Sequence, residues 1–182
     1  MRFLGLTEAS LYRKVGRSGN LWVLVGSRIP RVERVFQGAS AISLDAKGRL
    51  AVPTRYRASI AAQGEGQIIV TAHPHRCLLL YPRPAWEPIA TKIMALPSLD
   101  PAVSAMQQLL VGHADELEID SSGRILLSPT LRKLAGIDRE VMMFGQGTHF
   151  KLWNPEAWEK QFEAFSKLKP GVMPAGMESL SL

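Results

Sequence analysis

Two short stretches decide the fold of this chain: Leu44-Asp45-Ala46-Lys47-Gly48-Arg49-Leu50 and Ile119-Asp120-Ser121-Ser122-Gly123-Arg124-Ile125. Each has an Asp, two variable residues, a Gly and an Arg, with apolar residues on either side. An Asp side chain accepts hydrogen bonds from backbone N–H groups two residues on, and Gly tolerates a positive φ. Each stretch therefore predicts a tight turn between an incoming strand and a return strand, from which the Arg leaves in a fixed direction.

Further landmarks follow the two turns in the same order, which indicates an internal duplication. The corresponding segments are Pro53-Thr54 and Pro129-Thr130, Arg57 and Arg132, and Tyr81-Pro82-Arg83-Pro84-Ala85-Trp86 and Trp153-Asn154-Pro155-Glu156-Ala157-Trp158. Two copies of one unit predict a pseudo-symmetric body in which each half buries its apolar strand face against the other.

Hydrophobic periodicity and turn residues predict an α+β chain. The expected strands are residues 41–44, 49–52, 67–72, 77–81, 117–120, 124–127, 141–144 and 150–153, and the expected helices are 54–62, 84–94, 101–112, 131–135 and 155–169. Thr54 and Asp100 are the expected capping residues of two helices. The helix after Asp100 is expected to carry four apolar residues on one face, which are Val103, Met106, Leu109 and Leu110.

Charge and composition limit the possible classes of protein. The chain has 182 residues and a net charge of +6, but residues 1–34 hold seven basic residues against two acidic ones, so the remainder is nearly neutral. There is no apolar run of about 18 residues, so no membrane span is expected. The single cysteine, Cys77, excludes an internal disulfide framework and favours a reducing compartment.

A local basic cluster is expected at the first turn. Lys47 and Arg49 lie two residues apart at its tip, and Arg55 and Arg57 follow closely. In a nearly neutral body, such a cluster is suited to phosphate or guanine contacts. The second turn has two serines where the first has Ala and Lys, so it is expected to contact DNA weakly or to act as scaffold. The alternative for both turns is that Asp and Arg pair across a hairpin and only brace it.

Metal and catalytic sites are the weaker hypotheses. His73, His75 and Cys77 alternate along one stretch, but a closed zinc site needs four ligands, and Cys77 adjoins the apolar run Leu78-Leu79-Leu80, which favours a place in the core. His113 is expected to pack or to cap a helix end. Phosphate-loop, nucleophile-elbow and zinc-protease motifs are missing from the sequence, so we expect no enzyme activity, metal, cofactor or small-molecule ligand.

From Phe36 to about Phe165 the chain resembles the MraZ family of bacterial transcriptional regulators. The residues that carry the resemblance are Phe36-x-Gly38, Leu44-Asp45-x-Lys47-Gly48-Arg49-Leu50-x-Val52-Pro53, Cys77-Leu78-Leu79-Leu80-Tyr81-Pro82, Leu109-Leu110-x-Gly112-His113-Ala114 and Asp120-x-x-Gly123-Arg124. The resemblance implies two SpoVT/AbrB-type β units, ring-like homo-oligomers, and repression of the division and cell-wall gene cluster through G-rich direct repeats upstream of its own gene.

The family's DNA-contacting turn corresponds to Lys47, Gly48 and Arg49, and its second copy to Arg124. With Arg55 and Arg57 from the basic cluster, these residues make up the expected DNA-binding site. The expected organisation is an extension at 1–34, SpoVT/AbrB-like units at 39–85 and 114–157, a helical connection at 86–113, and a helix with a tail at 158–182. The expected partner is double-stranded DNA and the expected location is cytoplasmic and nucleoid-associated. The alternative function is a structural oligomer or a protein-interaction module.

Residues 1–34 depart from the family, whose members usually begin with Met-Phe-x-Gly. Val35 stands where the family has its initiating Met, and a valine codon GTG is an alternative bacterial start. The codons of Trp22-Val23 force the sequence TGGG, and codon choice permits further TGGG boxes, about one DNA turn apart, at Val15-Gly16, Ser18-Gly19 and Val25-Gly26. We therefore hypothesise that the native chain starts at residue 35 and that residues 1–34 are translated operator DNA. The alternative is a basic arm that adds non-specific phosphate attraction.

Overall fold

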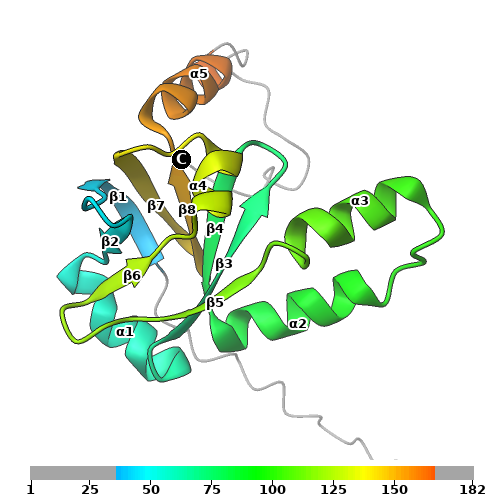
Figure 1. Ribbon diagram of the computed structural model, residues 1–182, viewed down its shortest axis with the longest axis horizontal. Helices are drawn as coiled ribbons and strands as arrows, with labels where there is room; N and C mark the ends of the chain where they lie inside the picture. Colours follow the sequence, from blue (N-terminus) through cyan, green and yellow to red (C-terminus); the bar gives the residue numbers. More distant parts are fainter. Residues whose placement is uncertain (1–35, 167–182) are drawn as a thin grey trace, which may run out of the picture. The chain divides into compact units, whose positions relative to one another are not determined.

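The computed structural model describes residues 36–166, which form eight strands and five helices (Figure 1). This mixture confirms the expected α+β class. The hypothesis of translated operator DNA at 1–34, the last residues of the helix expected to reach 169 and the expected tail at 170–182 lie outside this range. Among the described helices, none combines the length and the apolar content that a bilayer span requires.

The larger sheet has six antiparallel strands, three from each half of the chain, and the strands of the two halves are interleaved. Its order is β1 (Phe36–Ser43), β7 (Glu140–Gly147), β8 (His149–Trp153), β4 (Cys77–Pro82), β3 (Gln67–His73) and β5 (Asp115–Glu118). Strands β7 and β8 of the second half thus lie between β1 and β4 of the first. The two halves share one sheet and bury their apolar faces together, as the duplication predicted.

The strands that follow the two Asp-x-x-Gly-Arg turns pair with each other. β2 (Arg49–Ala51) and β6 (Arg124–Leu126) form a separate two-stranded antiparallel sheet. The hairpin between β1 and β2 that the turn suggested is wrong, because only a single bridge joins Leu44 to Leu50, while β1 pairs with β7 over its whole length. Pairing β2 with β6 buries Leu50 and Ile125 in the common core, which explains why β2 pairs with β6 instead of β1.

The core lies between the six-stranded sheet, the small β2–β6 sheet and two short helices. These helices are α1 (Thr54–Gly64) and α4 (Pro129–Ala135), which hold equivalent places in the two repeats. Phe36 and Tyr56 both contact Phe150, with ring centroids 4.3 and 4.8 Å apart. Thr54 does not cap α1 as expected, because Pro53 occupies the N-cap position and no side chain accepts a hydrogen bond there.

Helices α2 (Arg83–Met94) and α3 (Pro101–Leu110) form a helical arm that extends away from the β2–β6 sheet (Figure 1). Asp100 caps α3 as predicted, because its carboxylate accepts hydrogen bonds from the backbone N–H groups of Ala102 (2.8 Å) and Val103 (3.4 Å). Met106, on the expected apolar face, is 39% exposed, whereas its neighbour Gln107 is buried. Gln107 donates from Nε2 to the carbonyls of Ile93 and Leu96, at and just after the end of α2, and so ties α3 to the last turn of α2.

The last described helix, α5 (Pro155–Ser166), begins at Asn154, whose side-chain Oδ1 accepts a hydrogen bond from Ala157 N at 3.1 Å. The Asn154 amide also donates to the carbonyl of Gly136, just after α4, at 2.8 Å. One side chain thus fixes the start of α5 and ties it to the end of α4.

Candidate nucleic-acid interface

The first Asp-x-x-Gly-Arg turn is held by a single carboxylate. Oδ1 of Asp45 accepts hydrogen bonds from the backbone N–H groups of Lys47 and Arg49, both at 2.9 Å. Gly48 has φ +83° and donates its N–H to the Asp45 carbonyl at 2.8 Å. The Arg49 side chain turns back, so that its Nε donates to Oδ2 of Asp45 at 2.7 Å. The turn is therefore rigid, and Lys47 is exposed at its tip.

The second turn repeats this geometry. Oδ1 of Asp120 accepts from the backbone N–H groups of Ser122 and Arg124, both at 2.9 Å, and Arg124 Nε donates to Oδ2 at 3.0 Å. Gly123 has φ +77° and donates its N–H to the Asp120 carbonyl at 2.7 Å. The Asp–Arg pair that the sequence offered as a bracing interaction is thus present in both turns.

Hydrogen bonding lowers the pKa of both carboxyls. For Asp45 the main cause is the backbone N–H of Arg49; burial opposes the shift, and the Arg49 side chain and the N–H of Lys47 add to it. For Asp120 the backbone N–H of Arg124 is again the main cause. Both carboxylates are therefore ionised at neutral pH and offset the charge of their own arginine. Lys47 adds a further cation to the first turn, and the second turn has a serine at that place.

Each turn is attached to the opposite repeat. Because β2 and β6 run antiparallel, the two turns lie at opposite ends of this small sheet. Leu127 N donates to the carbonyl of Gly48 at 3.1 Å, and Val52 N donates to that of Gly123 at 2.9 Å. The two contacts are equivalent under the pseudo-symmetry.

The helix that follows each turn in sequence contributes its arginine to the other turn. Arg57 of α1 donates from Nε to the carbonyl of Val52 at 2.8 Å, and its guanidinium fills the space that a Cβ on Gly123 would need. In the same way, the guanidinium of Arg132 lies 3.1–3.4 Å from the position of a Cβ on Gly48. The expected cluster around the first turn is thus corrected: Arg57 lies at the second turn, and Arg132 takes its place.

Arg55 is held against β1 and away from either glycine turn. Its Nη2 donates to Ser40 Oγ at 2.6 Å and to the carbonyl of Ala39 at 3.1 Å. The guanidinium also lies over the ring of Tyr56, 4.7 Å from its centroid. Among the expected site residues, Lys47, Gly48 and Arg49 therefore lie together, Arg57 and Arg124 belong to the second turn, and Arg55 lies apart.

Comparison with known proteins assigns the family. The family model "MraZ protein, putative antitoxin-like" matches residues 35–109 and again residues 110–170. The chain belongs to the MraZ family. The tandem match also confirms the duplication that the two turns indicated.

Several relatives of known name in this family share about half of their residues with the chain. The protein of Methylobacillus flagellatus is 53% identical over 148 residues, which cover 81% of this chain and 100% of the relative. Proteins of Azoarcus sp. and Aromatoleum aromaticum are each 49% identical, with the same coverage. All three relatives are called "Transcriptional regulator MraZ".

Within this MraZ-family fold, Arg132 is the residue of the first turn that sequence reasoning missed. The repeat comparison had already matched Arg132 with Arg57. Distance along the sequence then assigned Arg57 to the turn just before it. Only the pairing of β2 with β6 reveals that the arginines cross over, and strand periodicity does not specify which strands pair.

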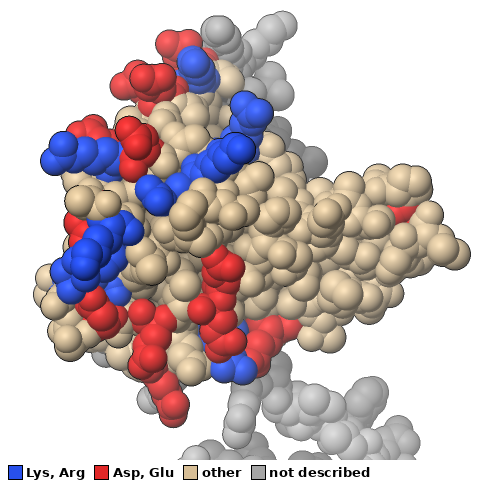
Figure 2. Space-filling view, viewed as in Figure 1, with Lys and Arg blue, Asp and Glu red and all other residues tan. Residues whose placement is uncertain are grey.

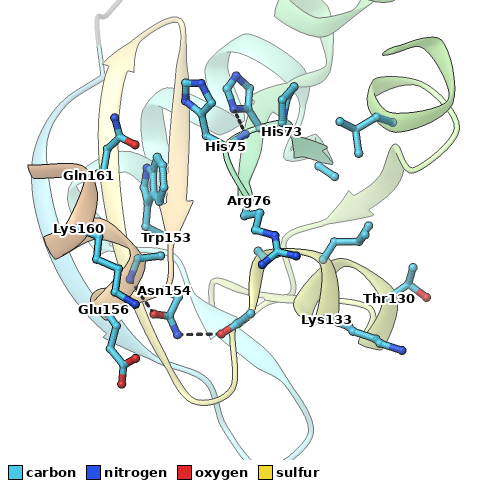
Figure 3. A pocket seen from close by; sticks show the side chains of 17 residues that line it. His73, His75, Arg76, Thr130, Lys133, Trp153, Asn154, Glu156, Lys160 and Gln161 are labelled. Atoms are coloured by element: carbon cyan, nitrogen blue, oxygen red, sulfur yellow. Dashed lines mark hydrogen bonds between the residues drawn. The ribbon is translucent and has the colours of Figure 1, made fainter. Parts of the chain in front are cut away.

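A groove of about 1100 Å³ lies between the β3–β4 turn, α4 and α5 (Figure 3). The imidazoles of His73 and His75 form an edge-to-face pair beside it. Burial, together with the charge of Lys151, lowers the pKa of His73 to about 4.

Cys77 is buried as expected, and burial raises its pKa to about 11, which leaves the thiol protonated at neutral pH. Among the described residues, no three His, Cys, Asp or Glu side chains come together as a metal site.

His113 follows α3, as the sequence suggested for a packing or capping residue. Its ring Nδ1 lies 2.9 Å from the carbonyl of Gln108, in the last turn of α3. The contact closes the end of the arm where α3 returns to the sheet.

Charge on the molecular surface is local. Figure 2 shows Lys and Arg side chains in several groups on the body, interleaved with acidic side chains, while the arm is almost without charge in this view. On the face in this view, the cations therefore lie in small separate groups and not in one broad basic patch.

Proposed function

We propose that this chain is a DNA-binding transcriptional regulator that represses the division and cell-wall gene cluster, including its own promoter. In this proposal it reads G-rich direct repeats that are spaced one DNA turn apart. Two facts support the proposal: the close relatives named transcriptional regulators, and the rigid turn that presents Lys47 and Arg49.

The observation that carries the proposal is the geometry of the first turn. Asp45 fixes the backbone from which Arg49 leaves, so little conformational entropy is lost when the arginine binds. Arginine pairs with O6 and N7 of guanine in the major groove, and lysine suits a neighbouring phosphate. Gly48 supplies the positive φ that the turn needs between Lys47 and Arg49. Arg49 shares Asp45 with two backbone groups, and its terminal nitrogens are the groups proposed to donate to guanine.

The remaining residues of the proposed site lie outside the first turn. Arg124 and Arg57 would act at the second turn, and Arg55 at the edge formed by β1. Without a lysine, the second turn is proposed to contact DNA more weakly than the first.

Several copies of the chain would assemble into a ring. Consecutive first turns would then meet consecutive boxes on one face of the duplex, and linked weak contacts would raise the effective concentration. The apolar side chains exposed on the arm, among them Leu99 at 98% exposure, support a contact between copies. A regulator of this kind needs neither catalysis nor a cofactor, and it would act at the nucleoid in the cytoplasm.

Binding to designed duplexes tests this function. The wild-type chain is titrated against a duplex with TGGG boxes one turn apart and against a scrambled duplex of equal composition. We expect tighter binding to the boxed duplex and a loss of about 10- to 100-fold for Arg49→Ala, as a bidentate guanine contact implies. Lys92→Ala, which removes an exposed cation from the arm, is the control and should bind like the wild type.

A structural oligomer or protein-interaction module is the second candidate, and the two Asp–Arg ion pairs favour it. In that case the turns only brace the strands. Arg49→Ala would then lower the unfolding midpoint, while the wild type would bind boxed and scrambled duplexes equally. That pair of results would exclude the DNA-reading function.

A further inference from the structure

The two arginines that cross between the repeats, Arg57 and Arg132, are equivalent in position but not in bonding. Arg57 donates from Nε to the carbonyl of Val52, so its guanidinium is fixed at the second turn. Nε of Arg132 is buried and has no hydrogen-bond partner, which holds for no other buried side-chain nitrogen or oxygen in the described part of the chain. The pseudo-symmetry therefore does not extend to the hydrogen bonding of these two Nε atoms.

A buried N–H of a charged group without an acceptor is unfavourable, and native structures rarely keep one without a reason. None of the ion pairs among the described residues joins Arg132 to a carboxylate. The carboxylate of Asp45 already accepts from the backbone of Lys47 and from the backbone and side chain of Arg49. The turn thus holds a guanidinium whose Nε lacks an acceptor, next to an exposed tip.

The position of Arg132 fits a ligand that approaches the tip. Its guanidinium lies against Gly48, the residue directly before Arg49 and directly after the exposed Lys47. An acceptor that reaches Arg49 along the turn therefore comes within range of Arg132 after a side-chain rotation. This rotation breaks no hydrogen bond at Nε, because Nε has none.

We propose that Arg132 is a further DNA-contacting residue of the first turn, supplied across the repeat boundary by α4. This inference rests on the proposed DNA-binding function and extends its site. The acceptor is an oxygen or nitrogen of the duplex, either a phosphate oxygen or O6 and N7 of guanine. The DNA-contacting surface at the first turn is then composite, with Lys47 and Arg49 from the first repeat and Arg132 from the second.

Binding measurements on Arg132→Ala test the inference, with Arg49→Ala and Lys92→Ala measured beside it. We expect Arg132→Ala to weaken binding to the boxed duplex by at least fivefold, in the range of a specific arginine contact. Lys92→Ala removes the same charge far from the turn and should change the affinity less than twofold. Arg132→Ala should keep the wild-type melting temperature within a few degrees, because Nε has no bond to lose.

A salt series and Arg132→Lys identify the acceptor. If Arg132 contacts a phosphate, Arg132→Ala reduces the slope of log affinity against log salt by about 0.9, and Arg132→Lys restores most of the binding. If it contacts guanine, the slope is unchanged, lysine does not restore binding, and the preference for the boxed over the scrambled duplex falls. Either outcome supports the inference.

Two results would overturn it. If Arg49→Ala weakens binding while folded Arg132→Ala binds like the wild type, the composite DNA-contacting surface is wrong and the proposed function stands. If the wild type does not prefer the boxed duplex, the proposed function fails, and the inference fails with it. Should Arg132→Ala unfold, the same binding measurements are made with Arg132→Lys and Arg132→Gln. Wild-type affinity in Arg132→Gln would exclude the contact.

Discussion

At the scale of single residues, three glycines with positive φ allow two costs of substitution to be distinguished. One is backbone strain, and the other is contact with a neighbouring side chain. Gly48, Gly66 and Gly123 have φ values of +83°, +84° and +77°. A Cβ on Gly66 would meet nothing within 4 Å, one on Gly48 would lie 3.1 Å from the guanidinium carbon of Arg132, and one on Gly123 would overlap Arg57. All three positions thus require a positive φ, but they differ in the side chain that a Cβ would meet.

Alanine at these positions should destabilise the fold in a fixed order. Gly66→Ala carries the left-handed backbone penalty alone, about 1–2 kcal/mol. Gly48→Ala adds the displacement of Arg132, and Gly123→Ala adds the loss of the Arg57 bond to Val52, so its free energy of unfolding should fall furthest. Urea unfolding of the three variants measures the order. Equal losses for Gly48→Ala and Gly66→Ala would mean that Arg132 moves away without cost.

At the scale of elements, the sequence predicts what is encoded locally. The two turns follow from the positions of Asp and Gly, and nearly every strand and helix lies within a few residues of its expected place. Pairing between strands is not local, so the β2–β6 pair and the crossing of Arg57 and Arg132 could not be predicted. The burial of Gln107 in α3 was not predicted for a similar reason, because its partners are carbonyls at the end of another helix.

Strands β3, β4 and β8 bring together histidines that resist protonation. Burial is the main cause that lowers the pKa of His73 to about 4, and Lys151, His75 and His149 add repulsion. Burial, followed by Lys151, also lowers the pKa of His149. The ordinary value for a histidine is 6.5, so these groups stay neutral in the folded chain at pH values where the unfolded chain takes up protons.

We therefore expect the free energy of unfolding to fall as the pH is lowered from 6.5 towards 4. In this range the unfolded state binds more protons than the folded state, so acid favours unfolding. Denaturant unfolding at pH 7 and pH 4.5 measures the change. His73→Asn, which does not titrate here, should show a smaller loss, and so should Lys151→Met, which removes a repelling charge. Parallel losses in the wild type and His73→Asn would contradict the assignment to His73.

At the scale of the whole molecule, the interleaved sheet makes the two repeats one folding unit. Strands β7 and β8 lie between β1 and β4, so neither half has a complete sheet alone. The arm is the exception, because it leaves this body and exposes apolar side chains at its tip. Met94 is 55% exposed, Leu96 49% and Leu99 98%. Scattered apolar residues are common on protein surfaces, but a group of this kind on a projecting element indicates an interaction surface.

If the arm joins copies of the chain, a charge at its tip should reduce assembly. We expect Leu99→Glu to shift the mass towards smaller species in size exclusion with light scattering, because the interface would have to bury an unpaired carboxylate. Leu99→Met keeps an apolar side chain, and Ala61→Glu adds the same charge to exposed α1, so both should assemble like the wild type. Smaller Leu99→Glu species should also bind single-box and multi-box duplexes with similar affinity, because linked contacts supply the avidity. An unchanged mass would exclude the arm tip as the contact, and strong multi-box binding by the smaller species would exclude the link between assembly and DNA affinity.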